Sequence, residues 1–143
     1  MEPTLLGPKN GQNDTVLVDL TAYNHSSPKR NDIVAYTHPT TGKKHCVKRT
    51  VAIPGDILFF SSTGIFVNDK LISPRPQNKM KHFVLFKNYT LPPNKYFLLG
   101  DNFNFSLDST EYGFINGNLI FGRVENIFYP LNRINQTLLK PSI

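Results

Sequence analysis

The sequence has little cysteine and no long apolar run. Its 143 residues include one cysteine, Cys46, which excludes a disulfide within the chain. No stretch approaches the ~20 apolar residues needed to cross a bilayer, and no secretory signal peptide is visible. What remains is a folded body with 39% hydrophobic and 18% charged residues. We expect one domain over residues 1–143, since this length suffices for a sizeable core.

The charge and the histidine pattern exclude two further classes of protein. The net charge is +6, but the basic residues are scattered and form no stripe, so nucleic acid is not favoured as a partner. An anionic membrane surface would also favour a basic body. The four histidines and Cys46 lack the spacing of a zinc site. We therefore expect no metal and no cofactor.

The apolar pattern is β throughout. No convincing helical stretch of about 12 residues appears, and the nearest candidate, residues 131–139, lacks caps. Short apolar runs bounded by Gly, Pro and Asn predict strands at residues 16–20, 33–36, 46–53, 57–60, 65–67, 70–72, 96–99 and 120–128. Gly122 in the last run is typical of a bulge. The pattern predicts an all-β barrel or sandwich of short antiparallel strands.

Four segments carry the most specific pattern of the chain. They are residues 1–5 (MEPTL), 28–34 (PKRNDIV), 46–56 (CVKRTVAIPGD) and 100–109 (GDNFNFSLDS). In this order and spacing they resemble the conserved boxes of the type I signal peptidases, the serine–lysine membrane proteases that cut signal peptides from exported proteins. The resemblance covers residues 1 to about 130, and it implies a signal-peptidase-like β fold and a Ser/Lys dyad.

The resemblance implies that the nucleophile lies outside the printed sequence. In the family the nucleophilic serine directly precedes the Met that is Met1 here, and a membrane helix lies upstream of it. We therefore expect the chain as printed, without that serine and anchor, to be inactive. A non-catalytic homologue that binds signal-like peptides, or a scaffold subunit, is the alternative of another class.

Lys48 and Ser106 match the other two catalytic positions of the family. A lysine acts as a general base only when neutral, and burial against apolar neighbours lowers its pKa from the free value of about 10.4. Ser106 would hydrogen-bond the lysine amine and aim it. Because alternate residues of a strand share one face, Cys46 and Lys48 should lie on one face and Val47 and Arg49 on the other, with Arg49 pointing away from the dyad.

Three further residues match structural positions beside the site. We interpret Asp101 and Asn102 as turn formers of the Gly-Asp-Asn loop. Asp108 matches an aspartate that in the family pairs with an arginine two residues on, but that position is Thr110 here. The partner of Asp108 is then open, and the candidates are Arg123, Arg49 and the backbone amides of Thr110 and Glu111.

The substrate implied by the resemblance is a signal peptide held extended as an added strand, with small side chains one and three residues before the cut. The residues that match the pocket walls are Met1, Leu5, Ala35, Cys46 and Val47. By composition alone each of them is equally a core hydrophobe.

Two branches of the superfamily fit the sequence. Residues 28–34, 53–56 and 67–70 favour bacterial signal peptidase I, with the domain on the outer face of the inner membrane. The loop at residues 6–14 and the lost arginine at Thr110 favour the mitochondrial inner membrane peptidase. That enzyme would act on the intermembrane-space side, with a possible partner subunit.

Overall fold

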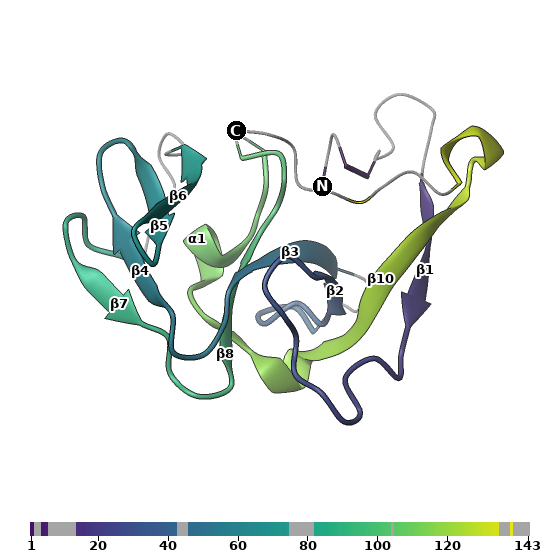
Figure 1. Cartoon of the computed structure of the whole chain (residues 1–143), viewed down its shortest axis with the longest axis horizontal. Helices are drawn as coiled ribbons and strands as arrows, with labels where there is room; N and C mark the ends of the chain where they lie inside the picture. Colours follow the sequence, from purple (N-terminus) through teal and green to yellow (C-terminus); the bar gives the residue numbers. More distant parts are fainter. Residues whose placement is uncertain are drawn as a thin grey trace.

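The chain folds into two antiparallel sheets (Figure 1). The structure, a computed structural model, describes residues 1, 4–5, 14–42, 46–74, 82–103, 105–134 and 138. The strands are β1 (Thr15–Asp19), β2 (Ile33–Tyr36), β3 (Cys46–Ala52), β4 (Ile57–Phe60), β5 (Gly64–Val67), β6 (Lys70–Pro74), β7 (Asn88–Thr90), β8 (Lys95–Leu99), β9 (Ile115–Asn116) and β10 (Ile120–Tyr129). A short helix, α1 (Ser109–Tyr112), and two 3-10 turns, Gly117–Leu119 and Leu131–Arg133, complete the described part.

The larger sheet has six strands in the order β1-β10-β2-β3-β8-β9, and the smaller has four in the order β6-β5-β4-β7. Every pairing between the described strands is antiparallel. The predicted all-β class is confirmed. The sequence did not predict the short strands β7 and β9 or the single turn α1, which are too brief to show periodicity. No helix in the described ranges combines the length and apolarity that a membrane span requires.

Strand β2 is the buried centre of the larger sheet, between β10 and β3. Its register pairs Ala35 with Val47 on β3 and with Gly122 on β10. The ladder shifts between Ile120 and Gly122, which confirms the predicted bulge. A Cβ at Gly122 would lie 2.6 Å from Val18 Cγ1 on β1, so only glycine lets β1 approach this closely.

The smaller sheet contains the meander that the sequence predicts. Strands β4, β5 and β6 are consecutive neighbours in it. The turn between β5 and β6 places Asn68 at φ 48° and Asp69 at φ 65°. Two successive left-handed residues are the requirement of a two-residue type I′ hairpin, which asparagine and aspartate tolerate.

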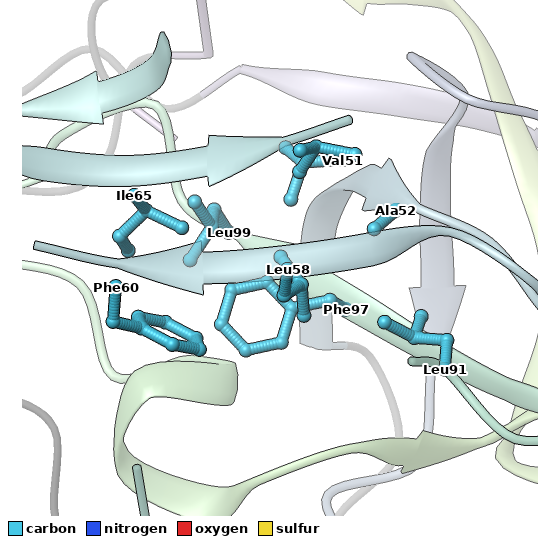
Figure 2. Packing of buried hydrophobic residues seen from close by; sticks show 9 residues of the cluster. Val51, Ala52, Leu58, Phe60, Ile65, Leu91, Phe97 and Leu99 are labelled. Carbon is cyan, nitrogen blue, oxygen red and sulfur yellow. The ribbon is translucent and has the colours of Figure 1, made fainter. Parts of the chain in front are cut away.

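A hydrophobic cluster joins the two sheets (Figure 2). Its buried members come from β3, β4, β5, β8 and the segment after β7, and they are Val51, Ala52, Leu58, Phe60, Ile65, Val67, Leu91, Phe97 and Leu99. The rings of Phe60 and Phe97 meet edge to face at 5.9 Å between centroids. This packing fixes the far end of β3, the strand that carries Lys48, against the second sheet.

The Pro-Gly-Asp turn ends β3. Burial tends to raise the pKa of Asp56, but hydrogen bonds from the Ile53 amide, Arg30 and Asn68 outweigh it, and the pKa is lowered from its usual value. The ionised carboxylate therefore ties the turn to the segment before β2 and to the β5–β6 hairpin. Gly55 adopts φ 88° in this turn, which favours glycine.

Thr50 places an unpaired hydroxyl in the core. The residue is 0% exposed, and within the described residues its Oγ1 has no hydrogen-bond partner. A buried hydroxyl without a partner costs about 1–3 kcal/mol, and an apolar group of the same shape removes this cost. We expect Thr50→Val to raise the free energy of unfolding by about 1 kcal/mol, measured by urea denaturation with an unchanged m-value.

Thr110 is the matched control, because it is also a buried threonine but its Oγ1 lies 2.8 Å from Asp108 Oδ1. Thr110→Val should lower the free energy of unfolding, since it leaves a carboxylate oxygen short of a donor. Equal destabilisation by the two substitutions would show that the Thr50 hydroxyl has a partner.

Candidate active site

Lys48 and Ser106 both lie beside Gly100, although they are 58 residues apart in the sequence. A Cβ built on Gly100 would fall 2.6 Å from Ser106 Cβ and 3.6 Å from Lys48 Cδ. The side chain of Ser106 thus occupies the space that any larger residue would fill, and Lys48 borders it at van der Waals distance. Glycine at this position lets the loop after β8 bring a buried serine hydroxyl up to β3.

The first half of β3 is the accessible half. Cys46, Val47 and Lys48 are partly exposed, whereas residues 49–52 are buried. Lys48 pairs with Val34 on β2, and its Nζ donates to the Val47 carbonyl at 3.2 Å. Lys48 is therefore partly exposed and has the buried Val34 as its neighbour on β2.

Arg49 extends away from Lys48 into a buried ion pair. Its Nε donates to Asp101 Oδ1 at 3.0 Å and its Nη2 to Asp101 Oδ2 at 2.9 Å. The exposed fractions of the two side chains are 2% and 3%. Nη1 also donates to the Asn31 carbonyl, and Nη2 to the Leu138 carbonyl. The geometry is the bidentate one that makes arginine–carboxylate pairs strong.

This ion pair gives Asp101 a role in addition to the predicted one of a turn former. Its carboxylate holds β3 and the loop after β8 together and also accepts a hydrogen bond from the hydroxyl of Thr4. Asn102 is partly exposed in the same loop, and its carbonyl accepts from the Phe105 amide at 3.2 Å, so it does form a turn. Sequence reasoning did not assign Thr4, although its place in the first box was a signal.

Asp108 is a helix cap. Its Oδ1 accepts from the Thr110 amide at 3.1 Å, which caps α1, and its Oδ2 accepts from the Gly100 amide at 3.1 Å. Neither Arg49 nor Arg123 is its partner, because Arg49 pairs with Asp101 and Arg123 with Glu125. Thr110 adds a hydroxyl donor to Asp108, so a cap and a backbone contact replace the expected arginine in fixing the loop.

Four of the five predicted pocket residues divide between two hydrophobic clusters, and the fifth, Ala35, belongs to neither. Met1, Leu5 and Val47 belong to one cluster, whose buried members are Leu5, Ile33, Val124 and Ile127. Cys46 packs on the other cluster, with Val34, Tyr36 and Leu98 among its members. The predicted alternation along β3 is therefore what the structure shows.

The environment of Cys46 and Ala35 is apolar. Burial, with smaller contributions from Cys46, Tyr112 and Asp108, raises the pKa of Tyr36 far above its ordinary range, so its phenol stays neutral. Ala35 is 2% exposed and pairs with Val47.

In the described ranges, no three His, Cys, Asp or Glu side chains gather as a metal would require; His45 lies outside them.

The fold and this arrangement define the class of protein. The chain resembles the crystal structure of a signal peptidase I from Enterococcus faecalis with a TM-score of 0.50, 24% sequence identity, and coverage of 70% of this chain and 98% of that one. The curled antiparallel sheets are thus the fold of a signal peptidase.

The family is shown by the sequence. The family model described as signal peptidase, peptidase S26, matches residues 1–129. The chain belongs to this family. It is 29% identical over 140 residues to the probable signal peptidase I-2 of Synechocystis sp., covering 94% of this chain and 61% of that protein. It is 30% identical over 147 aligned positions to the signal peptidase I of Bacillus amyloliquefaciens, covering 96% and 75%. These relatives are bacterial, so the mitochondrial alternative is not favoured.

Proposed function

We propose that this protein is a bacterial signal peptidase that removes N-terminal signal peptides from exported preproteins with a Ser/Lys dyad. The observation that carries the proposal is the position of Lys48 and Ser106 beside the same glycine, Gly100, in a chain of the signal peptidase family. The assigned nucleophile is a serine directly before Met1, as the resemblance to the family implies.

The proposal assigns a role in the reaction to each residue of the site. Neutral Lys48 takes the proton of the serine hydroxyl while the oxygen attacks the carbonyl carbon of the scissile bond. The amine of the mature protein leaves with that proton, and an acyl-enzyme remains. Lys48 then deprotonates a water that releases the signal peptide and the serine. Ser106 orients the lysine amine, and Asp108 and Asp101 hold the loop that carries Ser106.

The substrate would bind along the accessible half of β3. Met1, Leu5 and Val47 supply one apolar wall, and Cys46 contributes from the opposite face. Ala35 stays a predicted wall of the pocket for the substrate residue three before the cut. It lies on β2 beside Val47, its partner on β3. An apolar pocket of this kind discriminates between substrate side chains that differ by one or two methylenes. The difference in transition-state binding is about 1–3 kcal/mol.

We place the protein at the outer face of the bacterial inner membrane. The support is the family, together with the net charge of +6, which favours an anionic lipid surface. A flotation assay with vesicles containing anionic lipid tests this location. Recovery of the protein with neutral and anionic vesicles in equal amount would speak against an electrostatic contribution.

The function is tested by cleavage of a preprotein. A protein that carries serine directly before Met1 is incubated in detergent with a precursor bearing an Ala-x-Ala site, and the new N-terminus is sequenced. We expect a single cut after the second alanine. Binding of the signal peptide without cleavage would instead favour the non-catalytic homologue.

Ser106→Ala is expected to lower kcat by about 10-fold or more while KM stays near the wild-type value, because a positioning hydrogen bond acts on the base. The measurement is steady-state cleavage of the same precursor. Ser109→Ala is the control, since that buried hydroxyl accepts from the Leu98 amide at 2.9 Å and should affect stability more than kcat. An effect of Ser106→Ala on KM alone would move Ser106 into the substrate-binding site.

A further inference from the structure

A second, partly buried ion pair lies at the start of β1. Arg133 Nε lies 3.0 Å from Asp14 Oδ1, and its Nη2 donates to Asp14 Oδ2 at 3.0 Å. The side chain of Asp14 is 1% exposed and that of Arg133 16%. Asp14 directly precedes β1, and Arg133 ends the 3-10 turn after β10. The pair therefore closes the end of the β1–β10 ladder, where Thr15 pairs with Tyr129.

The same guanidinium also holds the first box of the sequence. Arg133 Nη2 donates to the carbonyl of Thr4 at 3.1 Å, while the hydroxyl of Thr4 donates to Asp101. Thr4 is thus held at its backbone by Arg133 and at its side chain by the Arg49–Asp101 pair. The next residue, Leu5, is 8% exposed in the cluster of Val124 and Ile127, and its amide donates to the Met1 carbonyl at 3.1 Å.

We propose that Arg133, fixed by Asp14, is a positioning residue for the peptidase reaction. It holds the Thr4 carbonyl and so sets where the segment of Met1, and with it the serine assigned before Met1, stands relative to Lys48. This inference rests on the proposed function. It assigns the C-terminal turn a task in the reaction, although Arg133 touches neither substrate nor reacting atoms.

The chemistry of the clamp is specific to arginine. Nη2 donates one hydrogen bond to Asp14 Oδ2 and a second to the backbone carbonyl of Thr4, while Nε lies at ion-pair distance from Asp14 Oδ1. A planar guanidinium can reach both partners at once because it carries several N–H groups in fixed directions. A lysine at this position would keep the charge but would bring a single ammonium in place of the planar guanidinium. Since an error of about 1 Å in a reacting group costs on the order of 100-fold in rate, loosening this contact should reach the reaction.

The kinetic test compares Arg133→Lys with Arg133→Met in the protein that carries serine before Met1. We expect both to lower kcat for the precursor by about 10- to 100-fold, with KM within about twofold of wild type and with most of the protein still folded at the assay temperature. Arg123→Met is the matched control, because Arg123 also lies near the C-terminus and pairs with Glu125, but both are well exposed. Wild-type kcat in Arg133→Lys would overturn the proposal.

A second readout separates this inference from the proposed function. Amide exchange at Leu5, measured by NMR on the 143-residue chain, should be accelerated by about 10-fold or more in Arg133→Lys, while exchange at Leu98 and Phe97 in β8 stays unchanged. A role confined to global stability would accelerate the Leu5 and β8 amides together, and would overturn the clamp. If the wild-type protein bound precursors without cutting them, the proposed peptidase function would be wrong. The exchange rate of the Leu5 amide would still decide whether Arg133 holds this segment.

Discussion

In the protein that carries serine directly before Met1, replacement of Lys48 by arginine is expected to lower kcat for cleavage by about 10²–10⁴-fold, the contribution of a general base. Arginine stays protonated at any working pH, so it cannot take the proton of the serine hydroxyl. The substitution keeps a long cationic side chain in the partly exposed half of β3, so folding should survive. The measurement is single-turnover cleavage of the precursor, which reports the chemical step itself.

Lys95→Arg is the control for this substitution. Lys95 lies in β8, pairs with Asn116 of β9 and is partly exposed, as Lys48 is, but it has no place in the proposed chemistry. We expect the Lys95→Arg variant to cleave at the wild-type rate. Wild-type turnover by Lys48→Arg, with an unchanged cleavage position, would show that another group is the base.

Arg49→Met is expected to destabilise the folded protein by about 3–5 kcal/mol, because it leaves the Asp101 carboxylate charged and buried without its partner. Asp101 would keep the hydroxyl of Thr4, which does not compensate a charge. The loss includes the contacts of Arg49 to the Asn31 and Leu138 carbonyls. The measurement is the free energy of unfolding in urea, with the m-value as the test of two-state behaviour.

Two comparisons make this prediction sharp. Arg123→Met breaks an ion pair whose side chains are 38% and 36% exposed, and exposed pairs contribute about 1 kcal/mol or less. The double variant Arg49→Met with Asp101→Leu removes both buried charges, and should recover part of the stability lost by Arg49→Met alone. Destabilisation by Arg49→Met no larger than that by Arg123→Met would mean that water reaches Asp101.

The Arg133 clamp and the Arg49–Asp101 pair act on the same residue from two sides. Thr4 donates its hydroxyl to Asp101 and accepts at its carbonyl from Arg133. The effects of Arg133→Lys and Arg49→Met on stability should therefore be non-additive, since residues that share a partner couple. The structure thus ties the first box of the chain to its last described turn through a single threonine.

The sequence by itself determined the longer strands, the turns between them and the order of faces along them. Strand β2 has the predicted bounds, β3 the predicted start, and the β4–β5–β6 meander its predicted turns. These features depend on the two-residue period of a strand and on turn chemistry, which are local properties of the chain. The resemblance of four short boxes added Lys48 and Ser106, which periodicity alone would have left as ordinary surface and loop residues.

Only the tertiary structure decided which charged groups meet. Arg49 and Asp101 are 52 residues apart, and their pairing depends on β8 lying beside β3 in the sheet. The sequence left several partners open for Asp108, and the structure gave it two backbone amides. Arg133 reaches Thr4 across 129 residues. Strand order and register set such contacts, and they follow from the packing of the whole chain, so no local pattern of residues predicts them.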